Sequence, residues 1–102
     1  MALSVIFRRA VGRDLAGAYW WHEERRRGLG EQFLAAVDAT FDQIEQFPEI
    51  FAVRYGRVRM AVVSHFPYVV FYRVDPRSVV ILTVLHTSED PKNWPQLPGK
   101  AR

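Results

Sequence analysis

Four side chains in the second half of the chain have the chemistry needed to cleave RNA without a metal ion. They are three arginines and one histidine: Arg57, Arg59, Arg73 and His86. Metal-free cleavage requires removal of the 2′-hydroxyl proton, stabilisation of charge on the phosphorane and protonation of the leaving oxygen. Arginine can stabilise the charge, and histidine can exchange the protons, as can a nearby phenol such as Tyr72. A metal-independent endonuclease is therefore one candidate activity.

Each of these residues also has a structural interpretation. Arg59 is equally suited to anchoring the sheet to a helix carboxylate, and His86 to capping the end of a strand with a hydrogen bond. Tyr72 lies in an apolar run, as core aromatics do. The residue types alone leave both interpretations open.

Other common chemistries lack their residues. The chain contains no cysteine, which excludes disulfides, thiolate catalysis and cysteine-based zinc sites. It has no glycine-rich phosphate loop, no serine triad and no carboxylate pair at catalytic spacing. His22 and His65 have no neighbours at metal-ligand spacing. We therefore expect no metal and no cofactor.

The composition indicates one globular domain over residues 1–102. Apolar residues make up 49% of the chain and charged residues 25%, with a formal net charge of +3 carried mostly by arginine. A basic surface of this kind is compatible with nucleic acid or with an acidic protein partner. No stretch predicts a signal peptide or a membrane span, so a cytoplasmic location is expected.

The first half of the chain predicts a short strand followed by a helical hairpin. Leu3, Val5 and Phe7 alternate along the strand, and the period then becomes helical over about 10–27 and 29–47. Gly28 suits a left-handed helix cap, and Pro48 ends the second helix. The apolar stripes of the two helices are Val11, Leu15, Ala18 and His22 on the first, and Phe33, Val37, Phe41 and Ile44 on the second.

The second half predicts three antiparallel strands at about 57–64, 67–74 and 79–86, after a connector over 49–56. The class is therefore α+β, with one twisted sheet and the helical hairpin on one of its faces. A four-residue turn over 75–78 would place Arg73 opposite Val80 and Val74 opposite Val79. Arg73 and His86 would then share a face, with Tyr72 on the other. The tail, 95–102, is expected to be flexible.

Several aromatic and basic residues are candidates for contact with a partner: Trp21, Arg25, Arg26, Tyr72 and Trp94. Trp20 and Trp21 point in different directions around the first helix, so they cannot both be central core. The run Arg25 to Arg27 is either a nucleic-acid patch or a solvated helix end. Trp94 either packs the tail onto the sheet or is a contact for a partner.

The order of these elements resembles the RelE/ParE superfamily of toxins from type II toxin–antitoxin systems, in particular its plasmid-stabilisation, ParE-like branch. The resemblance covers nearly the whole chain. It depends on local patterns at Asp14-Leu15, Phe33, Phe47-Pro48, Gly56-Arg57-Val58-Arg59, Phe66-Pro67-Tyr68 with Tyr72, and His86 through Asp90-Pro91 to Trp94.

This resemblance implies a bacterial toxin that is neutralised by a cognate antitoxin wrapped across it, as a homodimer or a heterotetramer with the antitoxin. ParE-like members poison DNA gyrase and are not enzymes, whereas RelE-like members cut mRNA in the ribosome. The candidates for contact with such a target or with the antitoxin are Trp21, Arg25, Arg26, Tyr72 and Trp94. A third possibility is a member that binds partners without being toxic. The FPY strand and the two helices of similar length favour the ParE side.

The sequence departs from the family's pattern at two points, and both weaken the nuclease interpretation. The only lysines are Lys92 and Lys100, whereas RelE-like nucleases use a basic cluster that includes lysines. Glu89 stands before Asp90-Pro91, where this branch frequently has arginine. A carboxylate there would oppose binding of a phosphate, although it could serve as a base. We therefore expect a ParE-like toxin that is not an enzyme.

Overall fold

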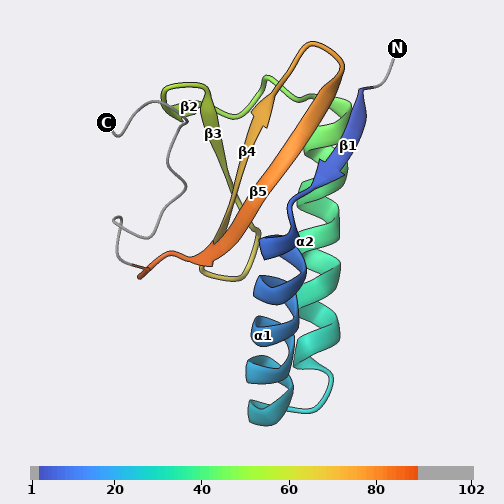
Figure 1. Ribbon diagram of the computed structural model, residues 1–102. Helices are drawn as coiled ribbons and strands as arrows, with labels where there is room; N and C mark the ends of the chain where they lie inside the picture. Colours follow the sequence, from blue (N-terminus) through green and yellow to red (C-terminus); the bar gives the residue numbers. More distant parts are fainter. Residues whose placement is uncertain (1–2, 90–102) are drawn as a thin grey trace.

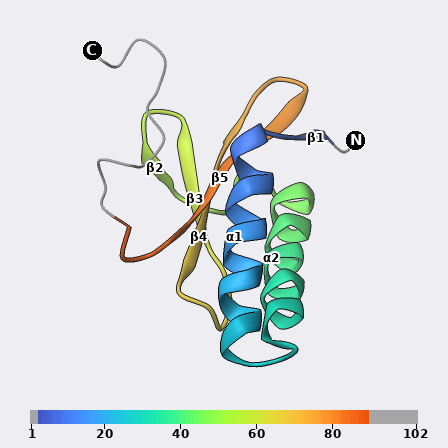
Figure 2. The same ribbon diagram turned by 60° about the horizontal axis from the view of Figure 1, so that its bottom comes forward.

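The computed structural model describes residues 3–89 and places two helices on one face of a five-stranded sheet (Figure 1). The elements are β1 (Ser4–Phe7), α1 (Arg9–Arg25), α2 (Leu29–Gln46), β2 (Val53–Tyr55), β3 (Val58–Val62), β4 (Tyr68–Val74) and β5 (Ser78–His86). In the rotated view the two helices lie side by side in front of the sheet (Figure 2). The predicted α+β architecture is confirmed. The predicted tail, 95–102, lies outside the described residues.

The strand order in the sheet is β1-β5-β4-β3-β2. β1 pairs with β5 in parallel, and the remaining neighbours are antiparallel. The helical hairpin thus connects β1 at one edge of the sheet with β2 at the other edge. The sequence does not predict β2, since residues 49–56 are expected to be a connector. This three-residue strand has no alternating pattern of its own and exists through pairing with β3 around a tight turn at Gly56, whose φ is 54°.

The hairpin turn is held by a carboxylate of α1. Gly28 has a φ of 88°, which confirms the left-handed conformation predicted for it. The two oxygens of Glu23 accept hydrogen bonds from the backbone N–H groups of Gly28 and Gly30, at 2.9 and 3.0 Å. Donors at the start of a helix have no intrahelical acceptor, so Glu23 satisfies two groups that the turn would otherwise leave to water.

Replacing Glu23 with alanine should lower the free energy of unfolding by about 1 kcal/mol, as the loss of a side-chain cap does elsewhere. Urea denaturation followed by circular dichroism measures the change. Glu24→Ala is the matched control, because Glu24 is its exposed neighbour on the same helix. Equal destabilisation by the two substitutions would contradict the capping role.

The core lies between the hairpin and the sheet, and the predicted stripes are confirmed. Phe33, Val37 and Ile44 of α2 are buried against strand residues that include Val70 and Ile81. His22 is buried as well, with its ring stacked on Phe33 at 4.8 Å and its Nδ1 2.6 Å from the Ala18 carbonyl oxygen. This histidine is a core residue whose polar atom is satisfied by the preceding turn of its own helix.

The opposite face of the sheet carries a second, smaller apolar cluster. Val58, Val69 and Phe71 are buried there, with Met60 and Leu82 packed against them. The two inner strands β4 and β5 are therefore apolar on both faces, which explains their nearly continuous hydrophobic sequences. Neither helix of the described chain is long and apolar enough to cross a membrane.

Candidate functional surfaces

Arg57, in the turn between β2 and β3, and Arg73, near the end of β4, share the carboxylate of Asp75 in the turn between β4 and β5. Asp75 Oδ1 accepts a hydrogen bond from Arg57 Nη2 at 2.7 Å and from Arg73 Nε at 3.0 Å. The hydrogen bond from Arg73 is the main cause of a lowered pKa for the Asp75 carboxyl, and the charges of both arginines add to it against a smaller effect of burial. Both guanidinium groups are thus paired within the chain.

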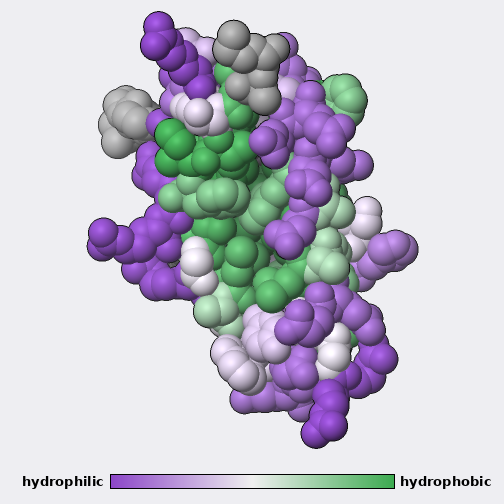
Figure 3. All heavy atoms as spheres, turned by 90° about the vertical axis from the view of Figure 1, so that its right-hand side faces the viewer, coloured by the Kyte–Doolittle hydropathy of each residue, from purple (hydrophilic) through white to green (hydrophobic). Residues whose placement is uncertain are grey.

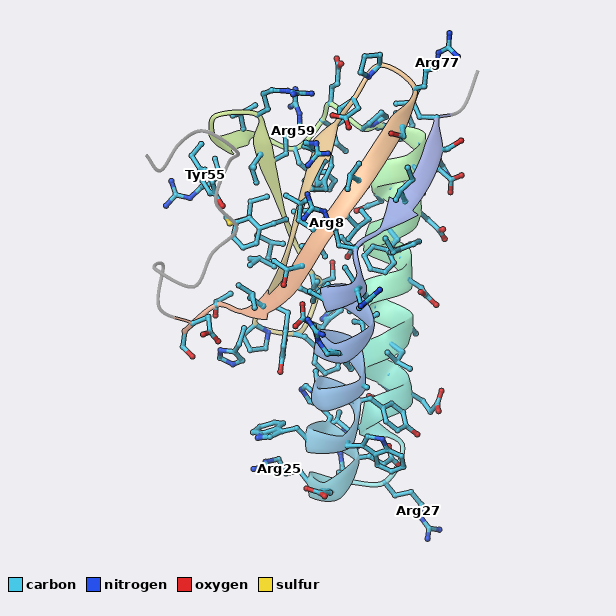
Figure 4. All side chains as sticks on the ribbon, in the orientation of Figure 1. Arg8, Arg25, Arg27, Tyr55, Arg59 and Arg77 are labelled. Atoms are coloured by element: carbon cyan, nitrogen blue, oxygen red, sulfur yellow. The ribbon has the colours of Figure 1, made fainter. Side chains whose placement is uncertain are left out.

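Arg59 supports the backbone of the segment before β2. Its Nη1 donates to the carbonyl oxygens of Phe51 at 2.7 Å and Glu49 at 3.2 Å. The anchoring role considered for this residue is present, but its acceptors are backbone carbonyls and not a helix carboxylate. Figure 4 shows Arg59 at the part of the sheet far from the hairpin turn, where Arg25 and Arg27 lie.

Tyr72 supports the same segment from inside the core. Its side chain is fully buried, and its hydroxyl donates to the Pro48 carbonyl oxygen at 2.7 Å. Burial raises the pKa of Tyr72 to about 12, partly opposed by the nearby charge of Arg59. A phenol held in this way is poorly placed to exchange a proton with a substrate or to touch a partner.

The Tyr72→Phe variant should lose about 1 kcal/mol of stability at neutral pH, because the Pro48 carbonyl loses its hydrogen bond. Tyr72 should also make the stability of the folded protein decrease at alkaline pH. Its folded pKa, about 12, lies above the ordinary value of 10.0, so its contribution is complete below pH 10 and is lost as the pH rises through that window. Above pH 10 the stability of Tyr72→Phe, measured by denaturation, should therefore fall less steeply with pH than that of the unmodified protein.

Tyr19→Phe is the control for the loss of stability at neutral pH, since the Tyr19 hydroxyl makes an exposed hydrogen bond to Glu31 at 3.2 Å. The pKa values of Tyr19, Tyr55 and Tyr68 are also raised, chiefly by burial, so Tyr72→Phe should retain part of the alkaline slope. An alkaline slope identical to that of the unmodified protein would contradict the assignment to Tyr72.

His86 lies at the other end of the sheet from the arginines. It pairs with Tyr68 of β4, whereas Arg73 pairs with Val80 as predicted. Arg73 is five positions along β4 from Tyr68, which corresponds to about 17 Å of strand. The Ser88 backbone N–H donates to His86 Nδ1 at 3.0 Å, in agreement with the capping role considered for this residue.

The expectation that Arg73 and His86 share a face is wrong. Phe71 pairs with Thr83 and Tyr72 with Ile81, so Leu82 has no partner and forms a β-bulge. The extra residue reverses the alternation along β5. His86 consequently packs on Tyr68 on the helix side, with ring centroids 5.1 Å apart, while Arg73 follows Val69 and Phe71 on the opposite side. The candidate nuclease residues do not form one site.

A pocket of about 370 Å³ lies between α1 and the end of β5. Its lining includes Asp14, Gly17 and Trp21 from α1, and Tyr68, His86 and Glu89 from the sheet side. The pocket brings two predicted residues together, the contact candidate Trp21 and the catalytic candidate His86. The carboxylates of Asp14 and Glu89 line the same pocket, and no sequence pattern connected them with Trp21 or His86.

Asp14 links α1 to β5, a structural role that the sequence patterns did not predict. Its Oδ2 accepts hydrogen bonds from the Thr83 hydroxyl and from the Val84 backbone N–H, the latter at 3.0 Å. β1 ends opposite Ile81, so the next part of the β5 edge has no strand partner on that side. Asp14 supplies the missing acceptor. One sequence feature could have indicated this role. Asp14 lies three residues after Val11, so its carboxylate is close to the apolar stripe that packs on the sheet.

The tip of the hairpin carries the exposed aromatic and basic candidates. The exposed fractions of Trp20 and Trp21 are 60% and 50%, so neither is central core. The Arg25 guanidinium lies 3.5 Å from the centre of the Trp21 ring, and its Nη1 donates to the Trp21 carbonyl oxygen at 2.8 Å. Arg26 is exposed beside them. Trp94 lies outside the described residues.

A further candidate surface lies along β1, which forms one edge of the sheet. Figure 3 shows apolar surface gathered on the side of the molecule that carries β1 and α2, bordered by hydrophilic residues. The exposed fractions of Ile6 and Phe7 are 49% and 50%, and the ring of Phe7 packs on Phe41 of α2. Arg8 and Arg9 follow immediately and are exposed. An exposed apolar edge next to cations is suited to an acidic, apolar partner.

Comparison with known proteins identifies a sequence family and solved structures with a similar fold. The sequence family described as the ParE toxin of the type II toxin–antitoxin system parDE matches residues 5–91. A chain from the chromosomal ParDE system of P. aeruginosa is similar with a TM-score of 0.74 at 16% identity, covering 82% of this chain and 95% of that one.

A chain of the RelBE2 toxin–antitoxin complex from Mycobacterium tuberculosis is similar with a TM-score of 0.61 at 24% identity, covering 84% of this chain and 99% of that one. At these identities the two structures show a shared fold. No protein with a curated description matches the chain.

Proposed function

This chain belongs to the ParE toxin family of type II toxin–antitoxin systems, and we propose on that basis that it inhibits bacterial growth by binding DNA gyrase. The proposal makes it a binding protein and not an enzyme. Because gyrase works in the bacterial cytoplasm, the proposal also assigns the chain to that compartment, and a role in plasmid stabilisation would follow if a plasmid encodes the module.

The observation that carries this choice is the separation of the candidate catalytic groups. Arg57 and Arg73 share Asp75, and Arg59 is bound to backbone carbonyls. His86 lies about 17 Å of strand away from Arg73 and on the other face. A phosphorane needs its charge stabilised next to the group that moves the proton. The described residues offer no such arrangement, which favours ParE-like binding over RelE-like mRNA cleavage.

Two readouts test the proposal, one on the purified chain and one in cells after induced expression. The purified chain should inhibit gyrase supercoiling and trap cleaved DNA. After induction, primer extension on translated mRNA should show no new cuts in the ribosomal A site. Cuts that disappear in His86→Ala would establish the RelE-like alternative. Arg59→Ala is a poor substitute in this test, because it also removes the hydrogen bonds to Glu49 and Phe51.

We further propose that an antitoxin covers the apolar edge formed by Ile6 and Phe7 with an acidic amphipathic segment. Arg8, Arg9 and Arg13 are exposed at this end of α1 and would attract such a segment. The association rate of the toxin with its cognate antitoxin should therefore fall with added salt. An association rate that does not depend on salt would contradict the proposed attraction of the antitoxin by these arginines.

A folded chain that leaves growth unaffected on induction would instead be a non-toxic partner-binding member.

A further inference from the structure

The pocket between α1 and the end of β5 has a charge opposite to that of the chain as a whole. The net charge of the chain is +3, yet the pocket is lined by the carboxylates of Asp14 and Glu89. None of the lining residues that the structure describes is an arginine or a lysine. Asp14 is fixed by the Thr83 hydroxyl and the Val84 N–H, so its negative charge has a defined position.

Aromatic rings form the walls of the same pocket. Trp21 lies on the helix side, and Tyr68 and His86 form a T-shaped pair on the sheet side, with centroids 5.1 Å apart. Gly17 contributes no side chain, and a Cβ added there would meet no atom within 4 Å. α1 therefore leaves open space between the two aromatic walls.

The His86 ring adds aromatic surface to the pocket, and its Nδ1 accepts a hydrogen bond from the Ser88 backbone N–H at 3.0 Å. Two carboxylates beside three aromatic rings favour a cation. This environment disfavours a phosphate, which Asp14 and Glu89 would repel.

The Trp21 ring already contacts a cation within the chain, the guanidinium of Arg25. This guanidinium lies 3.5 Å from the centre of the Trp21 ring, the geometry of a cation–π contact. Figure 4 shows Arg25 extending toward the side of the hairpin on which β5 ends, whereas Arg27 extends away from it. A planar guanidinium combines ring stacking with bidentate contact to a carboxylate, which an ammonium cannot do.

We propose that this pocket binds the guanidinium group of an arginine side chain presented by a partner protein. Trp21 and Tyr68 would enclose the guanidinium plane, and Asp14 and Glu89 would provide the opposite charge. The biological meaning of this site assumes the partner-binding function proposed above. Binding of a guanidinium group can nevertheless be measured on the isolated full chain, without gyrase or antitoxin.

The experiment is a titration of the ¹⁵N-labelled full chain with Nα-acetyl-arginine methylamide, followed by NMR. We expect saturable shifts of the Gly17, Val84 and Ser88 amides and of the Trp21 indole N–H. The citrulline analogue has nearly the same shape but no charge and should cause none of them. Equal shifts with citrulline, or an equal affinity for the lysine analogue, would overturn a guanidinium site.

Matched variants locate the site. Glu89→Gln should weaken binding about threefold, the effect of one partly exposed ion pair. Glu45→Gln removes the same charge from the exposed surface of α2 and should change nothing. Trp21→Leu keeps apolar bulk but removes the ring face, so it should also weaken binding. An unchanged affinity in both Glu89→Gln and Trp21→Leu would overturn the assignment.

Arg25→Gln tests whether the probe takes the place of Arg25 on the Trp21 ring. Because Arg25 would compete with the probe for this ring, its removal should tighten binding of the arginine probe about threefold. Weaker binding of the cationic probe in this variant would show that Arg25 does not compete with it and would overturn the proposal. Probe binding without gyrase inhibition would remove only the gyrase assignment, and gyrase inhibition without probe binding would remove only the arginine pocket.

Discussion

Alanine in place of Gly30 is expected to lower the free energy of unfolding by about 2 kcal/mol, within the range observed for overpacking of a tight contact. A Cβ at this position would lie 2.7 Å from Tyr19 Cδ1 and 2.8 Å from both Tyr19 Cε1 and the Tyr19 carbonyl oxygen. The ring can rotate, but the carbonyl oxygen belongs to the backbone of α1. The two helices must therefore separate near their connection, where Glu23 also bridges them.

Gly12→Ala is the matched control for this prediction, because a Cβ at Gly12 would meet no atom within 4 Å. Gly12 lies inside α1, where alanine stabilises a helix by about 0.5–1 kcal/mol relative to glycine. One chemical change should thus shift the urea midpoint downward at Gly30 and upward at Gly12. A downward shift of similar size at both positions would show that the Tyr19 contact is not the cause.

Replacement of Asp14 by alanine is expected to cost about 3 kcal/mol, because hydrogen bonds to a charged group contribute about 1.5–3 kcal/mol and two are lost. The Val84 side chain is only 3% exposed, and its N–H lies on an edge of β5 that has no strand partner. Without Asp14 this donor is left without its acceptor, and α1 loses a polar link to the sheet.

Amide hydrogen exchange at Val84 and urea denaturation together test this role of Asp14. Exchange at Val84 should accelerate more than the loss of global stability alone requires. Thr83→Val removes only the hydroxyl bond and should cost less than Asp14→Ala. Asp38→Ala, an exposed position on α2, should be nearly neutral. Unchanged Val84 exchange in Asp14→Ala would contradict the role of this carboxylate as a substitute for a strand.

Much of the fold could be predicted because its signals are local. The stripe Phe33, Val37 and Ile44 has helical period, Pro48 limits α2, and Gly28 permits the left-handed turn. The apolar runs of β4 and β5 predict that these strands are central in the sheet, which the strand order confirms. Each of these patterns reflects a constraint within a few residues, so the sequence reveals it without knowledge of any contact.

The candidate site could be predicted less well, because its geometry depends on pairing between distant segments. The unpaired Leu82 moves His86 to the helix side, and a bulge is a property of two strands together. Arg59 and Tyr72 bind carbonyls of the segment before β2, and hydrogen bonds of this kind follow no sequence period.

The sequence by itself determined the order of the elements, their apolar faces and the family patterns, because these follow from backbone period and residue type. Only the tertiary structure decided which polar groups meet. It separated His86 from Arg57, Arg59 and Arg73, and it placed His86 with Trp21, Asp14 and Glu89 around one pocket. The reason is physical: one extra residue in a strand reverses every later side chain, and a carboxylate on a helix can bind a strand edge about seventy residues away.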